Sequence, residues 1–346
     1  MKSFRIAVPD ADLEDLAARL DATRWPTALP DEHGYPLADL QALATYWRTT
    51  YDWRAAEAEL NTYPQFTIDL DGTTVHFLHV RSARADALPL VLTHGWPGSI
   101  VEFLDLVPLL SDFHLVVPSI PGFGFSQSTR GWDVPRVAAA WLELMDRLGY
   151  ERFGAHGGDW GSAISRVLGA LAPDRVVGVH LNYLPTPPAD GNFSPDDQAR
   201  LEQARQYLAN QPGVRVLNAQ TPQTVAYALT DSPVGQLAWI AERFAEWGTP
   251  IPTDRLLTNV MLYWLTRTAG TSARLHRETA AGPLPCPVPI GVAVFPHDIT
   301  RPVRALAERV YDIRHWSEFD NGGHFAALEA PDVLATDIRT FFSVLH

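Results

Sequence analysis

A short glycine-rich stretch constrains the fold of this chain more than any other part of the sequence. It reads Gly157-Gly-Asp-Trp-Gly161, between a strand-like segment (152–156) and an apolar, helix-like segment (162–171). Glycines remove the Cβ atoms that would clash in a tight turn from strand to helix. The pattern predicts a nucleophile elbow that displays Asp159.

Strand and helix patterns alternate along much of the chain, which predicts a mostly parallel sheet covered by helices on both faces. Further strands are expected at 75–80, 88–93, 113–120, 176–181, 290–295 and 313–319. Further helices are expected at 100–110, 134–148, 303–310 and 331–345.

Two regions depart from this alternation. Residues 1–70 are expected to form a helical extension, with one helix over 10–20 capped by Asp10 and a second helical stretch over 37–60. Residues 184–284 are also helical in pattern and separate two parts of the core, 71–183 and 285–346. Such an insertion is expected to form a cap over the active-site edge of the sheet.

An aspartate at an elbow attacks an electrophilic carbon and forms a covalent alkyl ester. The alternative is an ordinary Asp at a helix N-terminus. Chain order favours the first interpretation, because Asp159 is followed by Asp298 and then by His324, the nucleophile–acid–histidine order of α/β-hydrolases. Asp312 and Asp320 are alternatives for the acid.

The segment His94-Gly-Trp-Pro-Gly-Ser99 follows a strand, where oxyanion loops of this fold lie. The backbone N–H groups of Trp96 and Trp160 are expected to hold a developing oxyanion. His94 is expected to shape this loop through hydrogen bonds. No cofactor or metal motif is recognisable in the sequence.

Composition narrows the functional classes. A formal net charge of −13 argues against nucleic acid and anionic membrane surfaces. The single cysteine, Cys286, forms no internal disulfide, and neither a signal peptide nor an apolar membrane-spanning run is recognisable. A cytoplasmic protein without membrane partners is therefore expected, and a homo-oligomer is left open.

Seven segments in order resemble the microsomal-type epoxide hydrolases, over nearly the whole chain. They are 4–26, 94–99, 121–126, 157–162, 231–235, 256–264 and 322–326. The resemblance implies that Asp159 opens an epoxide and that His324, oriented by Asp298, activates a water to release a vicinal diol. The substrate is expected to be a bulky, apolar, small-molecule epoxide, because the cap and the extension are rich in aromatic residues.

One departure from the family concerns its two cap tyrosines, which bind and protonate the epoxide oxygen. Flanking residues place Trp239 and His276 at those positions. An indole N–H donates a hydrogen bond without releasing its proton, whereas a histidine is a true acid. We therefore expect His276 to be the acid and Trp239 to orient the oxygen. The alternative donors are three tyrosines, Tyr183, Tyr227 and Tyr263.

Two other functions remain open. A haloalkane-type dehalogenase would use the same Asp159 and His324, with N–H donors holding the departing halide. The second is a catalytically idle hydrolase-fold protein that binds a ligand. An idle protein need not keep the nucleophile, base, acid and oxyanion loop together, so the presence of all four argues against it.

Overall fold

The computed structural model describes residues 1–28, 34–128, 130–210, 213–279 and 286–345. Within these residues the strands form one nine-stranded sheet in the order β1-β2-β3-β5-β4-β6-β7-β8-β9. The strands are β1 (Lys2–Phe4), β2 (Gln65–Leu70), β3 (Thr73–Val80), β4 (Pro89–Thr93), β5 (His114–Pro118), β6 (Phe153–Gly157), β7 (Val176–Leu181), β8 (Ile290–Val294) and β9 (Ile313–Glu318).

From β5 across to β9 all neighbouring strands are parallel, whereas β1, β2, β3 and β5 pair antiparallel. The register places Thr93 of β4 opposite Gly157 of β6, and Gly157 opposite Leu181 of β7. The loops after these strands therefore meet at one edge of the sheet, where ligands bind in open α/β folds. The structure confirms the expected mostly parallel α/β sheet.

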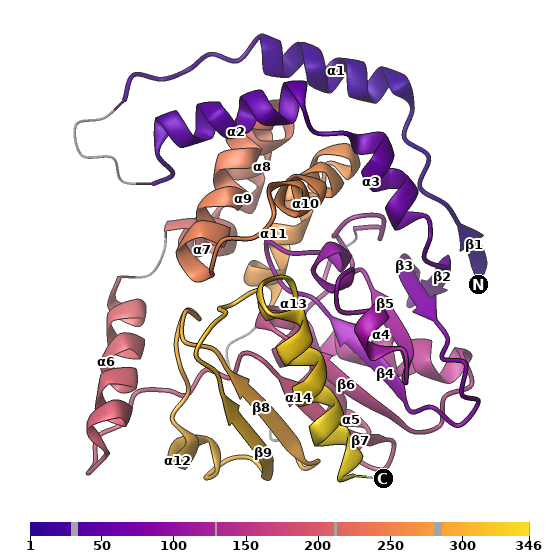
Figure 1. Cartoon of the computed structure of the whole chain (residues 1–346), viewed down its shortest axis with the longest axis vertical. Coiled ribbons are helices and arrows are strands. Elements are labelled where there is room, and N and C mark those ends of the chain that lie inside the picture. The colour runs from indigo at the N-terminus through magenta and orange to yellow at the C-terminus, as the bar shows by residue number, and fades with distance from the viewer. Residues whose placement is uncertain (29–33, 129, 211–212, 280–285, 346) are drawn as a thin grey trace.

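Helices flank the sheet on both faces (Figure 1). Outside the region between β7 and β8, the helices of the described chain, not all of which lie against the sheet, are α1 (Asp10–Asp21), α2 (Leu37–Thr49), α3 (Trp53–Leu60), α4 (Val134–Arg147), α5 (Asp159–Leu171), α12 (Arg304–Ala307), α13 (Ala326–Glu329) and α14 (Pro331–Ser343). A Cβ at Gly178 would approach Phe341 of α14, while the next residue, Val179, lies near α5. Because successive side chains of a strand point to opposite faces, α14 and α5 cover opposite sides.

Six helices of the described chain lie between β7 and β8, where a cap is expected. They are α6 (Pro195–Ala209), α7 (Gly213–Gln220), α8 (Pro222–Asp231), α9 (Pro233–Trp247), α10 (Thr253–Thr266) and α11 (Ala269–Glu278). Figure 1 shows α1 and α2 over α8, α9 and α10, on the side away from the sheet, and both contact α9. The expected cap boundary at residue 284 lies outside the described residues.

The extension differs from the expected all-helical segment, because it also contains β1 and β2. The three-residue β1 is too short to show a strand period, and it pairs with β2 at one end of the sheet. The helical stretch over 37–60 divides into α2 and α3, because the Asp52 side chain caps α3. Asp10 is the first residue of α1 rather than its cap, which is Pro9.

The segment 100–110 forms two short 3₁₀ helices, η1 (Ile100–Phe103) and η2 (Pro108–Leu110), instead of one α-helix. Pro108 has no N–H to continue an α-helical hydrogen-bond ladder. The Ser99 hydroxyl accepts the Val101 N–H at 3.2 Å and fixes the start of η1. The loop after β4 is thereby anchored next to the sheet edge that carries Asp159.

Candidate active site

Asp159 lies at the turn between β6 and α5 with a φ of 46°, a left-handed conformation that is uncommon for a residue with a side chain. A Cβ at Gly157 would lie 2.4 Å from the Gly161 carbonyl, and one at Gly161 would lie 1.9 Å from the Thr93 oxygen. Glycine is therefore required at both positions for the elbow to close against β4. About a fifth of the Asp159 side chain (21%) is exposed, enough for a substrate to reach it.

Two backbone amides hold the Asp159 carboxylate. The Trp96 N–H donates to Oδ1 at 2.8 Å, and the Trp160 N–H also hydrogen-bonds the carboxylate. Burial raises the pKa of Asp159, but the His324 imidazole and these two amides lower it by more, so the pKa lies below its ordinary value. The carboxylate is ionised at neutral pH, as a nucleophile must be.

His324 lies between two carboxylates. Its Nδ1 is 2.7 Å from Asp298 Oδ1, and its Nε2 is 3.4 Å from Asp159 Oδ2. Burial disfavours the imidazolium, but the two carboxylates outweigh this and raise the pKa of His324. Of the alternative acids, Asp312 forms an ion pair with Arg314 at 2.7 Å instead. The three residues in nucleophile–acid–histidine order are thus brought together.

The cap and β7 fix the position of His324. The backbone N–H of His324 donates to the Trp247 carbonyl at the end of α9 (2.9 Å), and the Asn182 side chain donates to the backbone carbonyl of His324 (3.1 Å). Glu329 accepts both the N–H and the hydroxyl of Thr249 at 2.6 Å, which joins the same end of α9 to the core. The catalytic loop and the cap are therefore one connected assembly.

Cap helix α10 holds the oxyanion loop. Asn259 donates to the Pro97 carbonyl at 2.8 Å, and the Tyr263 hydroxyl donates to the Gly98 carbonyl at 2.7 Å. The Tyr263 proton is thus already in use, which argues against this residue as a donor to substrate. His94 accepts a backbone N–H at 3.2 Å, in agreement with its expected structural role.

His276 lies over the elbow and the oxyanion loop. Its ring centroid is 5.4 Å from that of Trp96 and 5.0 Å from that of Trp160, edge-on to both. Its buried Nδ1 has no hydrogen-bond partner in the described chain. Burial lowers the pKa of His276 to about 4, with the Asp159 charge opposing. The ring is therefore neutral at neutral pH and offers an N–H for orientation rather than a ready acidic proton.

The other expected donors differ in position. The Tyr183 ring lies edge-on to His324 at 5.1 Å. Trp239 is half-buried in α9, and across the described residues no hydrogen bond or ring contact joins it to Asp159 or His324. Tyr227 is 71% exposed and lines a surface hollow of about 510 Å³ between α1, α8 and α10. Of the three expected tyrosines, Tyr183 is thus the one in ring contact with His324.

Three residues near the site carry no clear signal in the sequence. Glu102 of η1 is buried close to the charges of His324 and Asp159, and burial raises its pKa to about 8. Tyr207 of α6 and Arg215 of α7 interact with each other, and the Tyr207 phenol is also influenced by the Asp159 charge. Only the folding of distant segments brings Glu102 and Tyr207 within the influence of the Asp159 charge.

Over the described ranges, no group of three or more His, Cys, Asp or Glu side chains is arranged to hold a metal ion. A helix long and apolar enough to cross a bilayer is likewise not found there.

Comparisons with known proteins agree with this geometry. The family model "Epoxide hydrolase N terminus" matches residues 1–103, and "alpha/beta hydrolase fold" matches residues 89–266. A protein of Stigmatella aurantiaca is 46% identical over 99% of this chain and 85% of its own length. Epoxide hydrolase 1 of Sus scrofa is 32% identical over 100% of this chain and 89% of its own.

The structure of Aspergillus niger epoxide hydrolase superimposes with a TM-score of 0.92 at 30% identity, covering 100% of this chain and 96% of that one. The match extends through the N-terminal extension, the cap and both parts of the core. The chain belongs to the epoxide hydrolase family and has its α/β-hydrolase fold.

Proposed function

We propose that this enzyme hydrolyses a small-molecule epoxide to a vicinal diol through a covalent ester on Asp159. The observation that carries the proposal is the arrangement of that carboxylate. Oδ1 accepts the Trp96 N–H at 2.8 Å, whereas Oδ2 faces His324 at 3.4 Å. One oxygen is held in an oxyanion site and the other is left for attack.

In the first step, Oδ2 attacks a ring carbon, the ring C–O bond breaks, and its electron pair moves to the epoxide oxygen. Oδ1 stays with the Trp96 amide and becomes the carbonyl oxygen of the ester. Donors opposite Asp159, among them His276 and Tyr183, orient the epoxide oxygen. A carboxylate nucleophile divides a difficult hydrolysis into two easier steps.

The second step follows from the change in charge. The ester carries no charge, so His324 loses one of the two carboxylates that raise its pKa. Its proton is then released more readily, and the neutral imidazole, still oriented by Asp298, takes a proton from water. The water attacks the ester carbonyl carbon, and the Trp96 amide stabilises the oxyanion that forms on Oδ1. The bond from this carbon to Oδ2 then breaks, and Oδ2 leaves as a hydroxyl of the diol with the proton that His324 took from water. The water oxygen stays in the regenerated Asp159 carboxylate.

A bulky, apolar epoxide fits the aromatic side chains that surround the triad. Trp96, Trp160, Trp247 and Tyr183 all lie in ring contact with His276 or His324. These rings offer apolar area around a small number of polar groups, as in most small-molecule sites. We also propose a cytoplasmic location, which the single free and buried Cys286 supports.

Intact-protein mass of a His324→Ala variant tests the proposal. After incubation with styrene oxide, the variant is expected to gain the mass of one whole epoxide, because the ester forms but is not hydrolysed. The matched control is His324→Ala with Asp159→Asn, in which the gain should disappear. With 1-chlorohexane, a gain of the alkyl group alone would instead indicate a dehalogenase. No adduct with any epoxide or halide would favour an idle hydrolase fold.

A further inference from the structure

The loop that carries the catalytic acid has little structure of its own. Residues 298–303, between β8 and α12, form neither helix nor strand. Within the described chain, no backbone N–H donates to the carbonyl of Asp298, Ile299 or Pro302. Backbone carbonyls that are removed from water need partners, so this loop depends on side chains from other parts of the chain.

Gln203 of α6 supplies partners for most of this loop. Its side-chain N–H₂ group lies 3.4 Å from the carbonyl oxygens of both Asp298 and Ile299. Its side-chain oxygen accepts the Arg301 N–H at 3.3 Å. One amide therefore binds the loop from the residue of the catalytic acid to the third residue after it.

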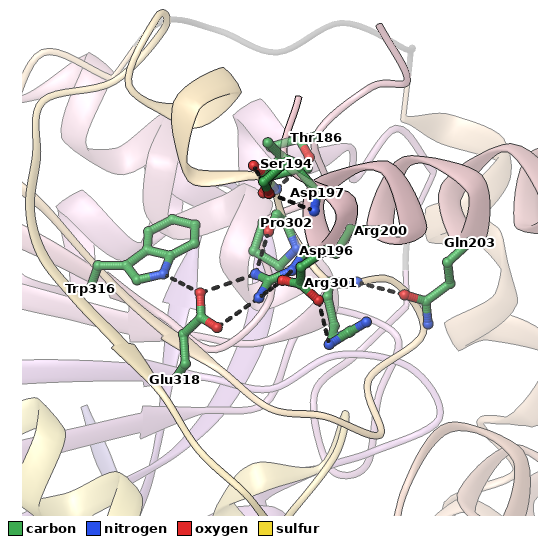
Figure 2. A network of polar contacts seen from close by, with 11 residues as sticks. Thr186, Ser194, Asp196, Asp197, Arg200, Gln203, Arg301, Pro302, Trp316 and Glu318 are labelled. Carbon is green, nitrogen blue, oxygen red and sulfur yellow. Dashed lines mark hydrogen bonds and ion pairs between the residues drawn. The ribbon is translucent and has the colours of Figure 1, made fainter. Parts of the chain in front are cut away.

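Arg200, three residues before Gln203 in α6, fixes the helix itself. It donates to both carboxylate oxygens of Glu318 at the end of β9 (3.0 and 2.7 Å) and to the Pro302 carbonyl (3.0 Å). Figure 2 shows these contacts, with the Trp316 indole donating to the same carboxylate at 2.9 Å. The Arg200 side chain is only 7% exposed. Arg200 thus joins α6, the acid loop and β9.

Helix α6 packs with the acid loop rather than with the rest of the cap. A small hydrophobic cluster, separate from the main core, places Leu201 of α6 with Val303 and Leu306. The Val303 N–H also donates to the Thr186 hydroxyl, in the segment before α6, at 3.0 Å. Figure 1 shows α6 standing apart from the bundle of α8 to α11. The position of the acid loop is therefore tied to that of α6.

These backbone contacts bear directly on the Asp298 carboxylate. Its Oδ1 lies 2.7 Å from His324 Nδ1 and accepts the Ile299 N–H at 2.7 Å. The Ile299 N–H and the Asp298 carbonyl belong to one peptide unit, and Gln203 binds that carbonyl. Because the peptide bond is planar, a contact that holds its carbonyl also holds its N–H, and with it the carboxylate.

We propose that Gln203 and Arg200 are positioning residues for Asp298. By holding the peptide unit after the catalytic acid, they keep its carboxylate in line with the His324 imidazole. This inference rests on the proposed function and concerns its second step. Asp159 attacks the ring without a general base, whereas attack of water on the ester needs an oriented, neutral imidazole. Loss of the α6 contacts should therefore slow ester hydrolysis and leave ester formation unchanged.

Two rate constants, measured separately, test the role of Gln203. At saturating styrene oxide, turnover divided by the fraction of enzyme held as ester, from rapid quench and intact mass, gives the rate constant of ester hydrolysis. The same substitution in the His324→Ala background gives the rate constant of ester formation. Gln203→Leu is expected to slow hydrolysis by about 10-fold, a part of the effect of a general base, and to leave formation unchanged. Gln206→Leu, at an exposed position of α6, is the matched control and should change neither.

The pH profile of ester hydrolysis distinguishes positioning from a general loss of structure. Asp298 raises the pKa of His324, and hydrolysis needs the neutral imidazole. With the acid displaced, His324 loses its proton at lower pH, so the acid limb of the profile should shift to lower pH in Gln203→Leu while the plateau falls. A general loss of structure would lower the plateau alone. The other titratable groups around His324 are unchanged in this variant, namely Asp159 (uncharged in the ester), Tyr183, Glu102 and Glu329.

Arg200 is tested by rescue with a second cation. Arg200→Gln is expected to slow ester hydrolysis by about 10-fold, because the paired bonds to Glu318 and the bond to Pro302 are lost. Arg200→Lys should recover part of the rate, since an ammonium keeps the charge but not the planar fork. Arg205→Gln, an exposed arginine of the same helix, is the control and should leave both steps unchanged.

Circular dichroism and thermal melts verify that each variant is folded. Unchanged hydrolysis in folded Gln203→Leu or Arg200→Gln would remove that residue from the assignment. Equal slowing of both steps, or an acid limb that stays in place, would overturn the assignment as a whole. A His324→Ala parent that forms no epoxide adduct would instead overturn the proposed function.

Discussion

At the scale of single residues, Glu102 is the least expected group near the site. It is a carboxyl buried in η1, and a Cβ at Gly98 would lie 1.3 Å from its Oε1, so the carboxyl packs directly against the oxyanion loop. Burial raises its pKa from 4.5 to about 8, so the folded chain keeps this carboxyl protonated at neutral pH.

This protonation predicts a pH-dependent stability. Between about pH 4.5 and 8 the folded chain holds a proton on Glu102 that the unfolded chain has released. The contribution of this proton to the unfolding free energy is therefore fully present below pH 4.5 and is lost as the pH rises through 8. Glu102→Gln removes it. Between about pH 5.5 and about pH 8.5, the parent should therefore lose about 3 kcal/mol of unfolding free energy that the variant does not lose.

Urea unfolding at both pH values measures this difference. Glu14→Gln, at an exposed carboxyl of α1, is the control and should follow the parent at each pH. Parallel pH profiles for Glu102→Gln and the parent would show that Glu102 keeps an ordinary pKa in the folded chain.

At the scale of elements, Arg255 joins three separate parts of the chain. From α10 of the cap it donates to Glu59 of α3 and to Asp105, between η1 and η2, at 2.7–3.0 Å. Only 18% of the Arg255 side chain is exposed. The N-terminal extension, the cap and the segment that follows the oxyanion loop are thereby coupled through one guanidinium.

Arg255→Ala is expected to lower the unfolding free energy by about 1–2 kcal/mol, since charge-assisted hydrogen bonds are lost but their carboxylates are partly exposed. Chemical denaturation followed by tryptophan fluorescence measures the loss. The control is Arg84→Ala, whose pair with Asp86 is exposed and local, and which should change stability by less than about 0.5 kcal/mol. Equal effects in the two variants would mean that the Arg255 bridge does not couple the elements.

At the scale of the whole molecule, the sequence predicted the sheet because buried parallel strands are continuous apolar runs. It predicted Asp159, Asp298 and His324 as a set because glycine spacing and chain order are local features that the α/β-hydrolase fold fixes. The short η1 and η2 were not predicted, because their hydrogen bonding depends on Ser99 and Pro108 rather than on apolar periodicity.

The position of α6 could not be predicted in this way. It depends on the Arg200–Glu318 contact, between residues 118 positions apart. The helical pattern of α6 carries no mark of such a contact. Positions inferred from flanking residues have the same weakness, because Trp239 and His276 lie in separate helices whose packing only the folded chain determines.

A single turnover in ¹⁸O-labelled water, with enzyme in excess over styrene oxide, tests the central claim most directly. If water attacks the ester carbonyl, the diol released first contains only unlabelled oxygen, and the heavy isotope appears in the Asp159 carboxylate of the proteolysed enzyme. If water attacked the epoxide directly, with Asp159 acting only as a base, the label would appear in the first diol and the Asp159 peptide would stay unlabelled. The covalent ester mechanism predicts the first result, and the second would contradict it.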